Sequence, residues 1–218
     1  MKWLRNNSLS LVFLLLFLFS MGAQAFTGWK EYNKEMQEEG GQTLGFGPYL
    51  TTAHFSEATF ENWESEFLQM ALFVILSMFL YQKGSSESKD PDKAEKVDED
   101  PRYSKKKNAP WPVHKGGLVL TLYEHSLSIA LTLLFLLSFL GHFKASLLDY
   151  NHHQCLLHLP AETASQYLTN SKFWFESFQN WQSEFLSVLA IVFLSIYLRQ
   201  KNSPQSKPVD APHAETGD

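Results

Sequence analysis

Four long apolar segments, separated by polar and charged stretches, dominate the pattern of this chain. Ser8–Phe26 and Ser126–Phe143 contain no charged residue, whereas Phe67–Tyr81 and Phe185–Leu198 are shorter and follow aromatic, partly charged runs. A helix needs about 20 mostly apolar residues to cross about 30 Å of hydrocarbon. The pattern therefore predicts an all-α membrane protein with four transmembrane helices. Burial inside a soluble core is the alternative for the two short segments.

The sequence also aligns with itself at an offset of 118 residues without a gap. Residues 4–85 and 122–203 share 29 identities in 82 positions, including Asn-Trp-x-Ser-Glu-Phe-Leu at Asn62–Leu68 and Asn180–Leu186. Shared apolar composition does not explain a mixed motif in the same register. We therefore expect two tandem membrane hairpin repeats, 4–85 and 122–203. Because each has two spans, both insert in the same direction, as parallel-oriented repeats.

Charged and polar residues fill the segment between the two repeats and the end of the chain. Residues 86–121 carry dense charge of both signs and few apolar side chains, and 204–218 are similar. Such segments cannot bury enough apolar surface to offset the entropy of ordering. They are predicted to be a disordered cytoplasmic linker and a disordered tail. The Lys105-Lys106-Lys107 triplet is interpreted as a solvated charge run, with contact to anionic lipid as the alternative.

The first apolar segment has a second interpretation, because it resembles a cleavable signal peptide. Lys2 and Arg5 precede the apolar run, and Ala23-Gln24-Ala25 has the small-x-small form of a cleavage site. However, the repeat aligns this segment with Ser126–Phe143, which is internal and cannot be a signal peptide. We therefore expect the first helix to be retained as a span.

Lysine and arginine in the flanking segments predict the orientation in the membrane. Fourteen lie in the N-terminus, central linker and tail, whereas the two remaining loops hold only four, at Lys30, Lys34, Lys144 and Lys172. Cytoplasmic loops carry the excess of positive residues. Both termini and the linker are therefore expected in the cytoplasm, and the two other loops outside.

Several motifs resemble a family of small bacterial multi-pass membrane proteins that is known as a domain of unknown function. They are Thr27–Asn33, Tyr49-Leu50-Thr51 and Glu61–Met70, and the resemblance covers nearly the whole chain outside the linker and tail. It implies a bacterial membrane protein, which we expect to lie in the inner membrane with several spans. It supplies no activity, substrate or catalytic residue.

A polar stripe accompanies the start of the second and fourth apolar segments. Helical spacing places its members on one face in each repeat. If the two stripes face each other, they line a polar cavity with two carboxylates, which suits a small transporter or channel. The alternative is that the polar groups hydrogen-bond between helices while the glutamates reach the interface. The stripe residues are Asn62, Ser65, Glu66 and Gln69, and Asn180, Ser183, Glu184 and Ser187.

Histidines and the lone cysteine gather in and near the second outer loop, which raises a metal-binding or haem-binding hypothesis. The equivalent positions in the first repeat hold no mirrored set of ligands. We therefore interpret these side chains as incidental and expect neither a metal nor a cofactor. The residues concerned are His142, His152, His153, Cys155 and His158.

Composition narrows the function without identifying it. The formal net charge is −5 and no face is plainly basic, which argues against a nucleic-acid partner. A single cysteine excludes an intramolecular disulfide framework. No familiar nucleophile, nucleotide or metalloprotease motif is present. We expect a non-enzymatic structural or interaction component of the bacterial envelope, with the lipid bilayer as partner and homo-oligomerisation allowed. A small transporter or channel and a membrane metal or haem binder are the alternatives.

Overall fold

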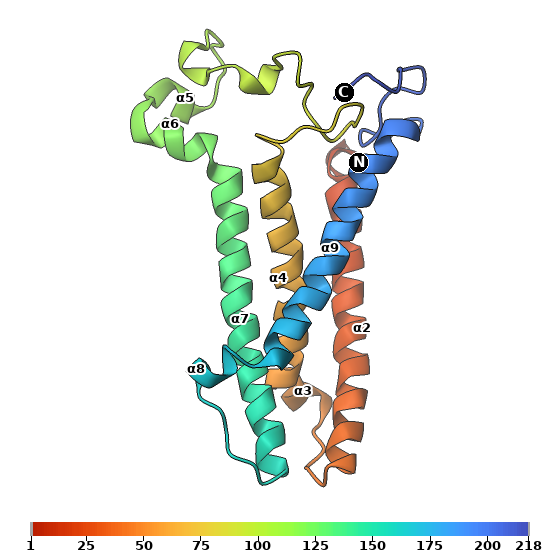
Figure 1. Cartoon of the computed structure of the whole chain (residues 1–218), viewed down its shortest axis with the longest axis vertical. Coiled ribbons are helices and arrows are strands. Elements are labelled where there is room, and N and C mark those ends of the chain that lie inside the picture. The colour runs from red at the N-terminus through yellow and green to blue at the C-terminus, as the bar shows by residue number, and fades with distance from the viewer. Residues whose placement is uncertain (1, 218) are drawn as a thin grey trace. The chain divides into compact units, whose positions relative to one another are not determined.

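The computed structural model describes residues 2–217, in which the regular elements are helices and no β-strand occurs, so the all-α class is confirmed. Figure 1 shows the helices in chain order. They are α1 (Lys2–Asn6), α2 (Ser8–Glu38), α3 (Phe46–Tyr49), α4 (Ala53–Leu76), α5 (Trp111–Lys115), α6 (Gly117–Glu124), α7 (Ser126–Leu156), α8 (Ala164–Tyr167) and α9 (Ser171–Tyr197).

The first and third apolar segments begin where the pattern predicts but form longer helices than expected. Both α2 and α7 have 31 residues and run beyond Phe26 and Phe143, because no proline interrupts the polar sequence that follows. Gly40 follows the end of α2 with a φ of 74°, and His158 follows the end of α7 with a φ of 56°. A left-handed residue just after the last turn is a common helix terminator.

The second and fourth apolar segments differ more from the prediction. Helix α4 ends at Leu76 rather than Tyr81, so its apolar part from Phe67 rises only about 15 Å, half of the hydrocarbon thickness. By length and composition, two helices among residues 2–217 could cross a membrane, α2 and α7, instead of the four expected. Polar and charged residues precede the apolar part of both α4 and α9.

Corresponding helices begin at the same offset as the internal sequence alignment. The pairs α2 and α7, α3 and α8, and α4 and α9 start 118 residues apart. The left-handed positions Gly40 and His158, and likewise Gly84 and Asn202, follow the same offset. The common helix starts agree with the register of the predicted repeat.

The chain divides into two compact units that do not follow the order of the sequence. Unit 1 combines Met1–Glu61 with Phe139–Trp174, and unit 2 combines Asn62–Ser138 with Phe175–Asp218. Each unit therefore contains sequence from both predicted repeats. Tyr32, Met36 and Tyr49 form a buried hydrophobic cluster in unit 1.

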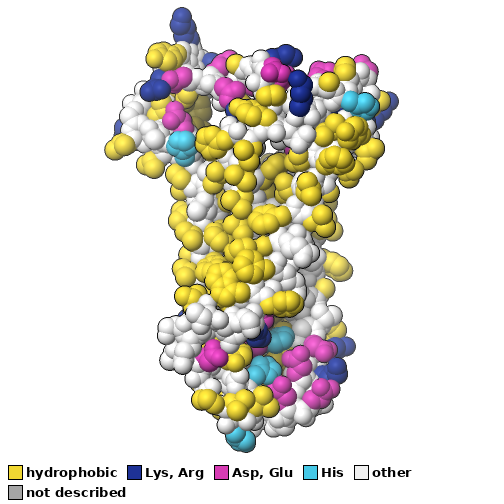
Figure 2. All heavy atoms as spheres, in the orientation of Figure 1, with side chains coloured by type: hydrophobic (Ala, Val, Ile, Leu, Met, Phe, Trp, Pro, Cys, Tyr) yellow, Lys and Arg dark blue, Asp and Glu magenta, His cyan; other side chains and the backbone are white. Residues whose placement is uncertain are grey.

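Much of the apolar surface has no protein covering it. The large apolar side chains of α2 from Val12 to Phe19 are 46–75% exposed, and hydrophobic side chains cover the long helices in Figure 2. A soluble protein seldom exposes a contiguous apolar patch of this extent. This exposed surface indicates an apolar environment around α2.

The segments predicted to be a linker and a tail contain short helices and hydrogen-bonded turns in unit 2. Besides α5 and part of α6, the linker holds 3₁₀ turns at Lys96–Asp98 and Pro101–Tyr103. In the tail, the Lys207 ammonium is buried and donates hydrogen bonds to the carbonyl oxygens of Pro212, His213 and Glu215.

Candidate functional site

Two asparagines fix the loops that follow the first and third long helices in unit 1. The Asn33 side chain donates to the Leu44 carbonyl over 2.8 Å and accepts from the Leu44 amide over 2.7 Å. Asn151 makes the same pair of bonds with Glu162, at 2.9 Å and 2.8 Å. Trp29 adds a further donor to the Leu44 carbonyl. Each loop is thus held against its own helix before the next helix begins.

Two buried tyrosines fill equivalent places beneath these loops. The rings of Tyr32 and Tyr49 are 5.6 Å apart, and those of Tyr150 and Tyr167 are 5.2 Å apart. The hydroxyl groups of Tyr49 and Tyr167 have different hydrogen-bond partners. The Tyr49 hydroxyl lies 3.2 Å from His54 Nδ1, whereas the Tyr167 hydroxyl is hydrogen-bonded to Ser146 over 2.6 Å.

Glycine at position 28 makes room for the first of these tyrosines. A Cβ at Gly28 would collide with the Tyr49 hydroxyl, whereas Ser146 occupies the equivalent position in the second copy and bonds to its tyrosine. Burial raises the pKa of Tyr49 to about 12, and the charge of Asp149 acts in the same direction. The hydroxyl therefore stays protonated at neutral pH.

A cluster of ionisable side chains lies beside this scaffold in unit 1. Glu57 and Asp149 are 7% and 6% exposed and line the same cleft, where each acid lies within electrostatic range of the other. Lys172 donates to Glu57 over 2.8 Å. One cation thus lies against a pair of buried acids that come from distant parts of the chain.

Two histidines extend the cluster toward more exposed acids. His153 lies 2.8 Å from a Glu39 oxygen through Nδ1 and 3.6 Å from an Asp149 oxygen through Nε2. His54 Nε2 lies 3.8 Å from Glu35. Figure 2 shows acidic and histidine side chains gathered where α2 and α7 end. An open cleft of about 460 Å³ is lined by Glu35, Glu39, His54, Glu57, Ala58, Glu61, Asp149, His153 and Lys172.

Burial shifts the protonation of two members of this cluster in opposite directions. It raises the pKa of Asp149 to about 7, with a further increase from the neighbouring Glu57 charge and decreases from His153 and Lys172. Burial lowers the pKa of His54, which outweighs the opposite effect of Glu35 and Glu57. Low polarity favours the neutral form of both groups.

The structure separates the histidines that the sequence brought together. His142 is fully buried with its ring centroid 5.0 Å from that of Phe173, whereas Cys155 is exposed and His158 follows the end of its helix. His152 contacts the ring of His153 at a centroid distance of 6.0 Å. Within residues 2–217, no group of three or more His, Cys, Asp or Glu side chains is placed to hold a metal ion.

The predicted polar stripe in unit 2 is only partly brought together. Gln69 Nε2 donates to Ser187 Oγ over 3.2 Å, and Glu66 lies within electrostatic range of Glu184. The serine hydroxyls at positions 65, 183 and 187 donate to carbonyls of their own helices, and Asn180 does the same. Asn62, Glu66 and Ser183 are exposed. The hydrogen bond between Gln69 and Ser187 joins the two stripes directly.

Sequence analysis missed the most deeply buried acid of this region. Glu64 is fully buried and accepts a 2.9 Å hydrogen bond from Trp181 Nε1. A helical stripe counted from Asn62 passes through Glu66 and leaves Glu64 on another face. Its one signal in the sequence is that the equivalent position of the second repeat, Gln182, is also polar.

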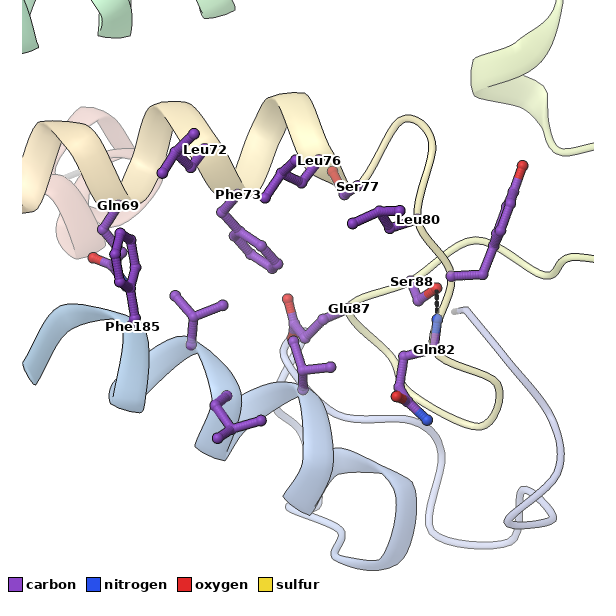
Figure 3. A pocket seen from close by; sticks show the side chains of 14 residues that line it. Gln69, Leu72, Phe73, Leu76, Ser77, Leu80, Gln82, Glu87, Ser88 and Phe185 are labelled. Carbon is purple, nitrogen blue, oxygen red and sulfur yellow. Dashed lines mark hydrogen bonds between the residues drawn. The ribbon is translucent and has the colours of Figure 1, made fainter. Parts of the chain in front are cut away.

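An apolar cavity of about 530 Å³ lies between α4 and α9 within unit 2 (Figure 3). Leu72, Phe73, Leu76 and Phe185 contribute to its wall. At the end nearest the linker, the backbone amide of Gln82 donates a 2.8 Å hydrogen bond to the Ser88 hydroxyl group. The cavity extends from the Gln69 side chain along the apolar part of both helices, and its polar lining residues are Gln69, Ser77, Gln82, Glu87 and Ser88.

Comparison with known proteins identifies a family but no activity. No curated protein and no solved structure matches this chain. One family model, described as a domain of unknown function, DUF6766, matches the whole sequence. Over residues 1–218, therefore, the chain belongs to the DUF6766 family.

Proposed function

We propose that this chain is a four-span integral membrane protein of the bacterial inner membrane that acts as a non-enzymatic structural or interaction component of the envelope. The exposed apolar surface of α2 carries this proposal, because side chains from Val12 to Phe19 that are 46–75% exposed would be costly in water. α7 adds a second helix of the same length and character.

The remaining two spans are proposed from α4 and α9 together with their flanking residues. The common offset of 118 residues in the helix starts supports two hairpin repeats inserted in the same direction. The distribution of lysine and arginine supports cytoplasmic termini and linker. In this topology the clamps at Asn33 and Asn151 lie on the outer side. The lipid bilayer is the first partner, and a second copy of the chain is another.

The exposed native cysteine tests this topology without a mutation. We expect the protein to stay in the membrane fraction after alkaline extraction, and Cys155 to react with a membrane-impermeant thiol reagent in intact cells. A matched variant with Cys155→Ala and Ala94→Cys should react only after permeabilisation, because position 94 lies in the linker. Recovery in the alkaline supernatant, or labelling of position 94 in intact cells, would contradict the proposal.

A small transporter or channel is the second candidate. The hydrogen bond between Gln69 and Ser187 and the buried Glu64 favour it, because ionisable groups inside a membrane commonly mark an ion or proton pathway. Proton flux into liposomes containing the purified protein, followed with an enclosed pH-sensitive dye, tests this candidate. We expect flux to fall at least tenfold in Glu64→Gln and in a Glu66→Gln/Glu184→Gln double variant.

Glu31→Gln is the matched control for this flux experiment, because Glu31 lies on an exposed turn of α2 and forms a surface ion pair with Lys34. It should leave the flux unchanged. Equal flux in all variants, or flux no greater than in empty liposomes, would exclude the pathway through these glutamates.

A further inference from the structure

We propose that Glu57 and Asp149 hold one proton between them near neutral pH, and that loss of this proton weakens the packing of α4 against α7 in unit 1. The two residues belong to opposite halves of the sequence, yet both are buried and line one cleft, where Glu57 acts on the Asp149 carboxyl group. Two neighbouring buried carboxyl groups favour holding one proton, since a carboxylate only accepts a hydrogen bond and the protonated acid can donate one. This site lies wholly within unit 1, so the inference does not depend on the membrane topology.

Burial makes the doubly ionised pair unfavourable. Glu57 and Asp149 are 7% and 6% exposed, so little water can stabilise their charges. Lys172 supplies one positive charge at 2.8 Å from Glu57. With one shared proton the pair and Lys172 are together neutral, whereas removal of that proton leaves one uncompensated negative charge. In the doubly ionised state the two carboxylates would also repel each other, because they carry like charges.

The other helices add groups of both signs around the pair. α4 also contributes His54 and Glu61, and α2 contributes Glu35, followed by Glu39 just beyond its end. Asp149 acts electrostatically on Tyr32 and Tyr49, which are neutral at this pH. The acids therefore outnumber Lys172, and protonated histidine is the only additional source of positive charge in the cleft.

His153 provides a path between the buried pair and the open cleft. Its Nε2 faces Asp149 at 3.6 Å and its Nδ1 faces Glu39 at 2.8 Å. Imidazole can accept a proton at one nitrogen and release a proton from the other. A proton leaving Asp149 binds to His153 Nε2, and the Nδ1 proton passes to the Glu39 carboxylate. The ring ends neutral, in its other tautomer.

The dependence of stability on pH follows from the direction of each shift. The pKa of Asp149 is raised to about 7 in the folded protein, so the folded state binds a proton that the unfolded state has released above pH 4. The resulting stabilisation is complete at low pH and is lost as the pH rises through about 7. The lowered pKa of His54 has the opposite effect on stability. The stabilisation that comes from neutral His54 in the folded state is lost as the pH falls through the ordinary histidine range.

Thermal unfolding of the full chain in detergent micelles between pH 6 and pH 8 tests the proposal. We expect the midpoint of the wild type to fall by about 2–4 °C across this range, on the scale that a loss near 1 kcal/mol produces in a protein of this size. Asp149→Asn should abolish this fall. Glu31→Gln, at the equivalent position of the first half and exposed on α2, should preserve it. An equal fall in Asp149→Asn would overturn the proposal.

Infrared difference spectroscopy provides a readout that does not require a stable variant. The wild type should show the carbonyl stretch of a protonated carboxyl group at pH 6, and this band should disappear by pH 8. The band should be missing from Glu57→Gln and Asp149→Asn. If the wild type shows no protonated carboxyl group at pH 6, the shared proton is excluded, whether or not the variants fold.

Discussion

The two halves of unit 1 have the same scaffold contacts but different ionisable side chains. In one half Asn33 fixes the loop after α2, and in the other Asn151 fixes the loop after α7. Each half also buries one tyrosine, Tyr49 or Tyr167, against another tyrosine. The polar clamp and the aromatic stack are therefore used twice with nearly the same geometry.

The ionisable positions differ between the halves. His54 corresponds to Lys172, Glu35 to His153, and Glu31 to Asp149 at the common offset. Of these residues, Lys172 donates to the buried Glu57, and His153 and Asp149 line the same cleft. A scaffold that is stabilised by backbone hydrogen bonds and aromatic packing leaves neighbouring positions free to acquire a separate electrostatic role. Variants at the equivalent positions can test this separation.

The largest expected effect follows from removal of the cation beside the buried acids. Lys172→Met should destabilise the protein by about 2–3 kcal/mol at pH 8, below the cost of breaking a fully buried pair because the lysine is partly exposed. The effect should be smaller at pH 6, where the acids hold a proton. Chemical unfolding at the two pH values measures both. Lys144→Met, at an exposed position of α7, is the control and should change stability little.

The next effect distinguishes the two tyrosine sites. Gly28→Ala should cost about 2 kcal/mol, because the new methyl group would collide with the buried Tyr49 hydroxyl. Gly22→Ala is the matched control in the same helix, since no heavy atom lies within 4 Å of the position of its Cβ. It should stabilise the helix by up to about 1 kcal/mol. Equal changes in the unfolding midpoint of the two variants would contradict close packing at Gly28.

The asparagine clamps should differ because only one has a second donor. Asn151→Ala removes the side-chain donor to the Glu162 carbonyl and should cost about 2 kcal/mol. Asn33→Ala leaves the Leu44 carbonyl bonded to Trp29 and should cost about 1 kcal/mol. Unfolding free energies of the two variants and of an Asn33→Ala/Trp29→Phe double variant measure this difference. The double variant should approach the cost of Asn151→Ala.

The smallest expected effect is a stabilisation. His158→Gly should gain about 0.5–1 kcal/mol, because glycine adopts the φ of 56° without the steric penalty of a side chain. Gly40→Ala, at the equivalent position with a φ of 74°, should lose a similar amount. Thermal midpoints of the two variants should therefore move in opposite directions. Movement in the same direction would show that the two helix ends are not equivalent.

The sequence predicted the helices well where a local pattern determined them. The apolar runs and the repeat register located the starts of α2 and α7 at Ser8 and Ser126. The ends of the helices were less predictable. Helix α4 ends at Leu76, although the apolar sequence continues after it without a proline or glycine. Whether an apolar residue continues a helix there depends on the contacts of Ser77–Tyr81 with the linker, which periodicity does not describe.

The candidate site was largely hidden from sequence reasoning for a different reason. Helical spacing grouped Glu66 with Asn62, but burial of Glu64 depends on Trp181 of another helix. Likewise, Asp149 and Glu57 lie in polar sequence that is typical of a solvated helix surface. Their burial follows from the assembly of two stretches that are distant in the sequence, Met1–Glu61 and Phe139–Trp174, into unit 1. A helical stripe identifies which side chains share a face, but the neighbouring helices decide which face is covered.

The ion pair between Glu57 and Lys172 has a consequence for how the protein is made. Its partners are 115 residues apart. At about 5–20 residues per second, a ribosome needs roughly 6–20 s to synthesise that stretch. During this interval the nascent first half presents Glu57 without its cation and an unfinished binding surface at the start of α4. Synthesis of Lys172 ends that interval, because this residue supplies the positive charge that Glu57 lacks until then.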